Sequence, residues 1–185
     1  MGAKGVKMLC GIDEAGRGPV AGCLAIAGVV LHDNISGLKD SKKLTQKRRN
    51  VLYKEIVKNS DYHIVKFSAQ DIDKFGLSKC ISIGLIEIMQ TIKASRYLFD
   101  GNTAFGVKNL QTLIKADTKI AEVSAASILA KVTHDNDIDL LDNKYPQYGF
   151  RSHKGYATAL HVKMIKKHGY CQQHRKSFKI KSLLV

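Results

Sequence analysis

The sequence predicts an α/β protein in which helices flank a mixed sheet, with a small helical appendage at the C-terminus. The chain has 185 residues, 44% of them hydrophobic and 25% charged, a composition typical of a globular domain. Apolar strand-like runs come first and then alternate with segments of helical periodicity, which indicates a mixed sheet covered by helices. No acidic residue follows Asp142. We therefore divide the chain into a main domain, residues 1–143, and a basic appendage, residues 144–185.

Five segments in the first half of the chain have the pattern of strands or helices. Apolar or alternating runs predict strands at Met8–Ile12, Val20–Leu31 and Tyr62–Phe67. Helical spacing predicts an amphipathic helix over Leu44–Lys58, with Thr45 as its N-cap and Val51 among its inward residues. The same spacing over Leu77–Ala94 is more strongly apolar, which indicates a helix packed into the core.

The second half continues the alternation. A short apolar run at Tyr97–Phe99 and another near Leu110–Lys115 predict two more strands, the second of them ending at Asp117. Small residues over 123–131 predict a helix that lies close to the sheet, followed by further helical turns. A last, basic helix is expected over Tyr156–Lys167.

Acidic residues follow three of the predicted strands: Asp13-Glu14, Asp100 and Asp117. Functional sites of open α/β sheets form at the carboxyl ends of strands. If these acids converge, their mutual repulsion must be neutralised, and divalent cations with oxygen ligands do this. Adjacent residues on a regular strand face opposite sides, so Asp13 and Glu14 reach one site only if the strand breaks at Gly16-Arg17-Gly18. The pattern predicts metal-assisted phosphodiester chemistry.

The charge of the chain points to a polyanionic partner. Thirty Lys and Arg residues stand against 16 Asp and Glu, a net charge of +14, and ten of the basic residues lie in residues 144–185. Six aromatic residues are interleaved with them: Tyr145, Tyr148, Phe150, Tyr156, Tyr170 and Phe178. Cations can bind phosphates and flat rings can stack on sugars and bases, which favours nucleic acid. Four histidines there are expected to contact phosphate or solvent: His153, His161, His168 and His174.

Several other classes of protein are excluded. Cys10, Cys23, Cys80 and Cys171 are scattered, which argues against a zinc site or a disulfide framework and for reduced thiols in the cytoplasm. The N-terminus lacks the apolar region of a signal peptide. The longest apolar stretch, Pro19–Leu31, is too short to span a bilayer. We expect a soluble cytoplasmic monomer without a membrane partner.

The glycines of Gly16–Ala21 formally match a dinucleotide-binding fingerprint, but their context is wrong. A strand-like run follows them instead of a helix, and Pro19 removes a backbone donor. A phosphate-binding loop of the P-loop type requires Lys followed by Ser or Thr, whereas this chain has Arg17 and Gly18. We therefore reject a nucleotide cofactor.

The segment Gly11-Ile-Asp-Glu-Ala-Gly-Arg-Gly-Pro19 resembles the signature of ribonuclease HII, the type 2 ribonuclease H. Further motifs continue the resemblance: Asp40-Ser-Lys-Lys-Leu44, Phe99-Asp-Gly-Asn102, Lys115-Ala-Asp117, Val123-Ser-Ala-Ala-Ser-Ile-Leu-Ala-Lys-Val132, His153-Lys-Gly-Tyr156 and His174-Arg-Lys-Ser-Phe178. Together they span residues 9–178, nearly the whole chain. The related ribonuclease HIII usually has Lys at the position of Arg17 and an extra N-terminal domain, for which this chain has no room.

The resemblance implies a ribonuclease H-like sheet and a set of site residues. The catalytic, metal-binding carboxylates would be Asp13, Glu14, Asp100 and Asp117, holding two Mg²⁺ or Mn²⁺ ions. Gly16, Arg17 and Gly18 would recognise the 2′-hydroxyl of a ribonucleotide, largely through backbone groups. Tyr156 would stack on the sugar of the next deoxynucleotide. A phosphate near the cut would be held by Ser41, Lys42 and Lys43.

The implied reaction is hydrolysis of the phosphodiester on the 5′ side of a ribonucleotide, leaving a 3′-hydroxyl and a 5′-phosphate. The substrates would be RNA/DNA hybrids and DNA duplexes with single embedded ribonucleotides, which connects the enzyme to ribonucleotide excision in DNA replication and repair. Metal-activated water requires no catalytic histidine.

The chain departs from the family pattern at three positions. Cys23 and Ala157 stand where proline is common, and His134 stands where arginine is common, which would weaken a phosphate contact. Asp135 is either an outer group near the metal ions or a capping or solvated residue. Lys179–Val185 contains no clear clamp-binding peptide, although its apolar end leaves a sliding-clamp contact open.

Two other functions remain open at this point. A non-catalytic nucleic-acid-binding module would explain the basic C-terminal segment but has no use for acids at the strand ends. Another two-metal nuclease or a resolvase would explain the acids but not Gly16-Arg17-Gly18 together with Tyr156.

Overall fold

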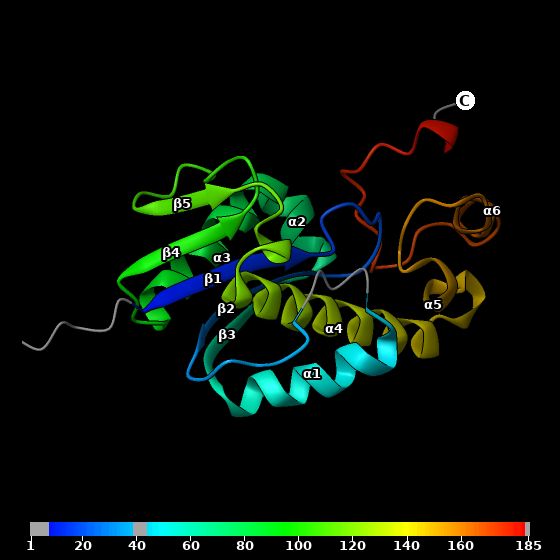
Figure 1. Cartoon of the computed structure of the whole chain (residues 1–185). Coiled ribbons are helices and arrows are strands. Elements are labelled where there is room, and N and C mark those ends of the chain that lie inside the picture. The colour runs from blue at the N-terminus through cyan, green and yellow to red at the C-terminus, as the bar shows by residue number, and fades with distance from the viewer. Residues whose placement is uncertain (1–7, 39–43, 184–185) are drawn as a thin grey trace, which may run out of the picture.

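A five-stranded mixed sheet forms the centre of the computed structural model, which describes residues 8–38 and 44–183 (Figure 1). The strands are β1 (Leu9–Ala15), β2 (Leu24–Leu31), β3 (Ser60–Phe67), β4 (Arg96–Asp100) and β5 (Leu110–Leu113). Their order is β3-β2-β1-β4-β5. The first three strands pair antiparallel, and β4 and β5 run parallel to β1. The predicted mixed sheet is therefore confirmed.

Helices cover both faces of the sheet (Figure 1). They are α1 (Gln46–Lys58), α2 (Ala69–Phe75), α3 (Leu77–Thr91), α4 (Ala121–Lys144), α5 (Phe150–His153) and α6 (Ala159–His168). The alternating side chains of β2 divide between two cores: Ala27 and Val29 pack with α1 and α4, whereas Leu24 and Ile26 pack with α2 and α3. Residues on the two faces of β2 thus pack against the two helical layers, one on each side of the sheet.

Small residues let α4 lie directly on the sheet, as the sequence predicts. A Cβ atom placed on Gly11 of β1 would lie 2.3 Å from the backbone nitrogen of Val123. On the helix, Ala125 and Ala126 are fully buried in the same layer. This close contact sets the distance between α4 and the C-terminal end of β1, where the first acidic residues stand.

Some element boundaries differ from the predictions. The hydroxyl of Thr45 accepts a hydrogen bond from the Arg48 backbone as the predicted N-cap, but Val51 is 49% exposed instead of facing inward. The strand expected from Val20 begins only at Leu24, because residues 20–22 pair with the C-terminal segment: Gly22 donates to the Gln173 carbonyl. α2 was not predicted; its seven residues begin with a capping box.

The C-terminal part packs beyond the end of α4, as Figure 1 shows for α5 and α6. Its own small core includes Tyr148 and Phe150, which are 2% and 0% exposed. The expectation that these two rings contact nucleic acid is therefore wrong, since they are needed to bury the C-terminal helices. The basic helix begins at Ala159, with Thr158 as its N-cap, and not at Tyr156.

The last described segment returns to the main domain. Asp73 of α2 accepts hydrogen bonds from the backbone nitrogens of Lys176 and Ser177, each at 2.9 Å. The division after residue 143 falls at the end of α4, which continues without a break to Lys144. Among the helices of the described residues, none combines the length and apolarity needed to cross a membrane.

Candidate active site

Three aspartates meet at one end of the sheet. Asp13, Asp100 and Asp117 each offer a carboxylate oxygen, and these atoms lie within 4.8 Å of one another. In the parallel pair of β1 and β4, Ile12 is opposite Phe99, so the next residue of each strand, Asp13 and Asp100, lies at the same level on the face toward α4.

Asp117 belongs to a different structural element from the one predicted. It lies in a 3₁₀ turn, Ala116–Thr118, between β5 and α4, and not at a strand end. Lys115 before the turn adopts a left-handed backbone conformation with φ of 57°. The Ala116 backbone nitrogen donates to Asp100 Oδ1 at 3.1 Å. This bond ties the turn to the carboxylate of β4.

The cluster holds negative charge that the surrounding protein only partly compensates. Burial raises the pKa of Asp13 well above its ordinary value, and the neighbouring carboxylates of Glu14 and Asp100 raise it further. Hydrogen bonds from the Ser127 side chain and from the Glu14 backbone nitrogen, the latter 2.8 Å from Asp13 Oδ1, work in the opposite direction. Crowded carboxylates with an all-oxygen donor set fit hard divalent cations such as Mg²⁺ or Mn²⁺.

Glu14 lies next to this cluster but is not part of it. β1 ends after Ala15, directly before Gly16-Arg17-Gly18, where the strand was predicted to break, but it stays regular through Asp13 and Glu14. Glu14 instead lies 3.6 Å from the Arg17 guanidinium. Burial raises its pKa, Arg17 lowers it and Asp100 raises it. Glu14 Oε2 is buried and has no hydrogen-bond partner among the described residues, as expected for an oxygen available to a cation.

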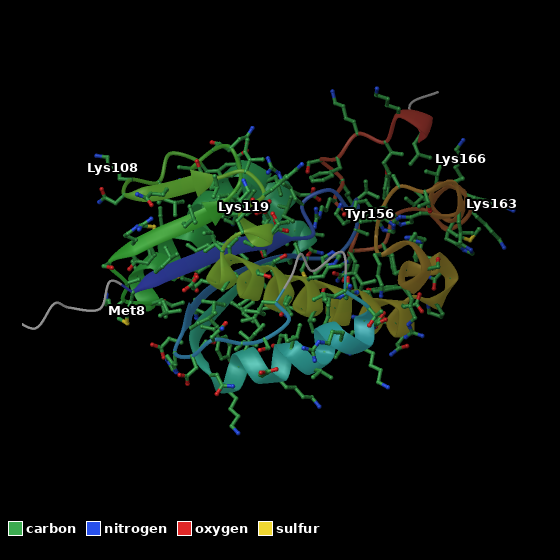
Figure 2. All side chains as sticks on the ribbon, in the orientation of Figure 1. Met8, Lys108, Lys119, Tyr156, Lys163 and Lys166 are labelled. Atoms are coloured by element: carbon green, nitrogen blue, oxygen red, sulfur yellow. The ribbon has the colours of Figure 1, made fainter. Side chains whose placement is uncertain are left out.

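A cleft of about 560 Å³ connects Asp13, Glu14 and Asp100 with other predicted site residues, whereas Asp117 lines a separate hollow. Its lining includes Asp13, Glu14, Asp100, Gly16, Arg17, Gly18, Lys115, Ser127, Lys131, His134 and Tyr156. Tyr156 is 50% exposed, and Figure 2 shows it between the sheet domain and α6. A Cβ atom on Gly18 would approach the Tyr156 ring to 3.2 Å. The cleft thus brings together three groups that are far apart in the sequence.

The glycine segment passes through a space that admits no side chain. Gly16 has φ of 87°, and a Cβ atom there would lie 2.4 Å from both the Cys23 carbonyl oxygen and the His134 ring. The neighbouring Arg17 side chain is 49% exposed, and its guanidinium carbon is 5.4 Å from the centre of the Phe105 ring. The backbone of this segment therefore forms the wall of the cleft.

The buried Arg175 side chain holds the backbone of the glycine segment, a role that was not predicted from the sequence. Its side chain is 1% exposed and donates to the carbonyls of Gly16 at 2.7 Å, Cys23 at 2.9 Å and Arg17 at 3.3 Å, and also to Gly22. Burial lowers its pKa to about 10, so it stays cationic at neutral pH. The only signal was its place in the motif His174–Phe178, because its partners precede it by more than 150 residues.

Asp135 and His134 hold the opposite wall. Asp135 is 5% exposed in the middle of α4, so its interpretation as a capping or solvated residue is wrong. It binds Lys131 Nζ at 2.8 Å and lies 3.7 Å from Arg49. Burial opposes its ionised form, but hydrogen bonds from His134 and Lys131 outweigh burial and lower its pKa to about 2. Asp135 thereby holds Lys131, a lining residue of the cleft.

His134 is 2% exposed, with Nδ1 3.4 Å from Asp135 Oδ1 and its ring against Gly16. Its Nε2 atom has no hydrogen-bond partner among the described residues. The predicted phosphate-binding residues Ser41, Lys42 and Lys43 lie outside the described residues.

A mixed sheet with these helices and an acidic cleft at the strand ends defines a ribonuclease H-like protein. The family model described as Ribonuclease HII matches residues 10–181. The chain therefore belongs to the ribonuclease HII family, and the class of enzyme that it represents is a ribonuclease H-type nuclease.

Individual relatives agree with this assignment. The chain is 55% identical to Ribonuclease HII of Sulfurovum sp. (strain NBC37-1) over 177 residues, which cover 96% of this chain and 94% of the relative. It is 56% identical to Ribonuclease HII of Campylobacter hominis over 177 residues, covering 95% and 96%. A solved PCNA:RNase HII complex from Archaeoglobus fulgidus contains a chain with a TM-score of 0.80 at 30% identity, covering 94% and 96%. Bst-RNase HIII in complex with Mn²⁺ shares the fold, with a TM-score of 0.71 at 15% identity over 92% of this chain and 67% of that one.

Proposed function

We propose that this protein is a metal-dependent endoribonuclease that hydrolyses the phosphodiester on the 5′ side of a ribonucleotide. Its substrates are RNA/DNA hybrids and DNA duplexes with single embedded ribonucleotides, and its products carry a 3′-hydroxyl and a 5′-phosphate. The observation that carries the proposal is the shared cleft, in which Asp13 and Asp100 of the aspartate cluster, the glycine segment and Tyr156 face the same space. This activity removes ribonucleotides from DNA during replication and repair.

The acids of the cleft hold the metal ions in this proposal. Asp13, Asp100 and Asp117 bind two Mg²⁺ or Mn²⁺ ions together with Glu14, whose unpartnered oxygen supports such a role. Divalent ions at such a site supply activated water and charge stabilisation for the leaving oxygen. Ser127 and the Ala116 backbone nitrogen orient the carboxylates of Asp13 and Asp100 before the ions bind.

The glycine segment and Tyr156 recognise the substrate. The lack of side chains at Gly16 and Gly18 lets the backbone approach the ribose, where its polar groups distinguish a 2′-hydroxyl from hydrogen. The exposed Tyr156 ring stacks on the sugar of the next deoxynucleotide. Both contacts together make an RNA-to-DNA junction the preferred substrate. Residues 144–185 bind the duplex backbone through exposed lysines.

A labelled DNA duplex with one embedded ribonucleotide tests the activity. With Mg²⁺ or Mn²⁺ we expect a single cut on the 5′ side of the ribonucleotide and no cut in the matched all-DNA duplex. Asp100→Asn is expected to abolish cleavage and leave duplex binding largely intact, because it removes a metal ligand without changing the basic surface. Binding without cleavage under every divalent ion would indicate a non-catalytic module, and equal cutting of all-DNA duplex would indicate an unspecific nuclease.

Tyr156→Ala tests the junction contact separately. We expect its cleavage rate to fall by about tenfold on the embedded ribonucleotide, in line with the stacking energy of one base or sugar. On a continuous RNA/DNA hybrid the loss is expected to be smaller. Initial rates on the two substrates, measured side by side, check the difference. An equal loss on both substrates would contradict the junction role.

A further inference from the structure

Three histidines of the C-terminal segment are buried together behind Tyr156. His153, His161 and His174 are 7%, 0% and 1% exposed, so the expectation that they contact phosphate or solvent is wrong. The rings of His153 and His161 stack with their centres 4.2 Å apart. The Phe150 ring packs on both His161 and His174. This cluster lies in the same small core that carries the C-terminal helices.

Hydrogen bonds through the cluster run in one direction. The Cys171 backbone N–H donates to His174 Nδ1 at 2.9 Å, so a neutral His174 carries its proton on Nε2. His174 Nε2 lies 3.0 Å from His161 Nε2, which must then be the acceptor. The proton of a neutral His161 is consequently on Nδ1, and this atom lies 2.9 Å from the Tyr156 carbonyl oxygen. Each nitrogen and oxygen atom in this series of hydrogen bonds is thus assigned as either a donor or an acceptor, without conflict.

Both histidines have to be neutral for this arrangement. A second proton on His161 would sit on Nε2, opposite the Nε2–H of His174, and a second proton on His174 would sit on Nδ1, opposite the Cys171 backbone N–H. Burial, together with the neighbouring His153, lowers the pKa of both side chains to about 4. Cys171 and Tyr148 also lie against His174. The hydrogen-bond chain is therefore intact at neutral pH.

The chain of bonds connects the two substrate-reading elements of the cleft. At one end, the Tyr156 carbonyl accepts from His161 and also from the Thr158 backbone at 2.8 Å. At the other end, His174 pairs with Ala21 in an isolated bridge, and the next residue, Arg175, binds the carbonyls of the glycine segment. His161 and His174 themselves are not among the residues that line the cleft. Their link to the cleft is the hydrogen bond from His161 to the Tyr156 backbone.

We propose that His161 and His174 are positioning residues that hold Tyr156 against the glycine segment and thereby set the preference for RNA–DNA junctions. This inference rests on the proposed function, in which Tyr156 contacts the deoxynucleotide. Without the bond from His161, the Tyr156 backbone loses one of the two donors that fix its carbonyl. The ring is then less well oriented in the cleft, so junction substrates are affected more than continuous hybrids.

Two substitutions of similar size separate positioning from packing. In His161→Asn the side-chain amide reaches the place of Nδ1 and can still donate to the Tyr156 carbonyl. In His161→Gln the amide reaches the place of Nε2, where it can accept from His174 but leaves the Tyr156 carbonyl without that donor. His63→Gln is the matched control, because His63 pairs with Glu87 on the surface of β3.

The measured quantity is the ratio of cleavage rates on the embedded ribonucleotide and on the continuous hybrid. We expect His161→Gln to lower this ratio about fivefold, and the double variant with Tyr156→Ala to be no lower than Tyr156→Ala alone, since the two act through one contact. His161→Asn and His63→Gln are expected to keep the wild-type ratio. Equal effects of His161→Asn and His161→Gln, or a wild-type ratio in His161→Gln, would overturn the proposal.

A second measurement needs no variant. Long-range ¹H–¹⁵N spectra of the wild-type protein at neutral pH are expected to show His161 protonated on Nδ1 and His174 on Nε2. The opposite assignment would mean that His161 does not donate to the Tyr156 carbonyl, which would overturn the proposal. Failure of the proposed function is recognised separately. In that case the wild-type protein does not cut the ribonucleotide substrates, or Tyr156→Ala leaves the ratio unchanged, and the positioning role falls with it.

Discussion

Asp100 stands between two other carboxylates, and its charge is a cost to the fold until a cation binds. It contributes to the raised pKa of both Asp13 and Glu14. Asp100→Asn removes this repulsion, and its remaining side-chain oxygen can still accept from the Ala116 backbone. In EDTA we therefore expect the variant to melt at the same temperature as the wild type or a few degrees higher.

Addition of Mn²⁺ should reverse that order. A cation that binds only the folded state at about 100 times its Kd adds roughly 2.7 kcal/mol, which raises the melting temperature of the wild type by several degrees. Asp100→Asn is expected to show little of this increase. Thermal unfolding followed by circular dichroism, with and without Mn²⁺, checks both parts. Equal stabilisation of the two proteins by Mn²⁺ would show that Asp100 is not a ligand.

At the level of single residues, the sequence predicted those parts of the site that depend on local order along a strand. Asp13 and Asp100 could be paired because each follows an apolar strand. The support from Ser127 and Arg175 could not be predicted, because it depends on how α4 and the C-terminal segment pack against β1. Glu14 illustrates the limit: the end of β1 before Gly16-Arg17-Gly18 was predicted, but the ion pair between Glu14 and Arg17 was not.

Among the elements, α4 and β1 make a tight backbone contact at Gly11. Its absent Cβ atom leaves room for the Val123 backbone, which cannot move without shifting the whole helix. Gly11→Ala is therefore expected to lower the free energy of unfolding by about 3 kcal/mol or more. Urea denaturation measures this loss.

Gly106→Ala provides the control for Gly11→Ala. Gly106 has φ of 78°, and a Cβ atom at this position would have no other atom within 4 Å. Alanine there therefore strains only the backbone, at a cost of about 1 kcal/mol. If Gly11→Ala cost no more than Gly106→Ala, the contact between helix and sheet would be looser than the structure indicates.

Elements with strong periodicity were predictable from the sequence, and short ones were not. The long apolar pattern of α3 and the small residues of α4 identified both helices, with ends displaced by a few residues. α2 was not predicted, because seven residues are too few to show a helical periodicity, although Ser68 and Asp71 form a capping box. The sequence pattern predicts a strand that ends at Asp117, whereas Asp117 lies in a 3₁₀ turn. β5 is mostly exposed, so the hydrophobic pattern does not show at which residue this strand ends.

The whole molecule is expected to lose stability in mild acid because of its buried histidines. His161 and His174 have pKa values of about 4 in the fold against 6.5 in an unfolded chain. Between pH 6.5 and 4 the unfolded chain binds protons that the fold excludes, so stability is complete above this range and falls as the pH decreases through it. Each histidine contributes a slope of up to roughly 1.4 kcal/mol per pH unit.

Urea denaturation at several pH values measures this slope. His161→Asn is expected to reduce it by up to roughly 1.4 kcal/mol per pH unit, since the contribution of one buried histidine is gone. Asp135 does not interfere, because its pKa of about 2 shifts its own effect to pH values below 3.8. Asp13 and Glu14, whose pKa values are raised in the fold, act in the opposite direction, but they are present in both proteins and cancel in the comparison with His161→Asn. A slope unchanged in His161→Asn would mean that His161 is not neutral in the fold.

The net charge of +14 resides mainly in the C-terminal part of the molecule, whereas the carboxylate cluster lies in the main domain. Figure 2 shows Lys163 and Lys166 on α6, at the opposite end of the molecule from Lys108. If residues 144–185 bind the duplex backbone, each lysine that contacts a phosphate releases about 0.9 counterions. Replacing Lys163 or Lys166 by Gln should then lower the slope of log K against log salt by up to about 0.9 per contact. Lys108→Gln, which removes the same charge elsewhere, should leave the slope unchanged.

Binding is best measured with Asp100→Asn in EDTA, so that the duplex stays intact, over a series of salt concentrations. Equal slopes for all three lysine variants would mean that the molecule attracts nucleic acid only through its net charge. A smaller slope for Lys163→Gln and Lys166→Gln alone would locate the duplex on α6. Since the phosphates then pass from α6 over Tyr156 toward the aspartates, the basic part determines how the duplex lies, and the acidic cleft determines which bond is cut.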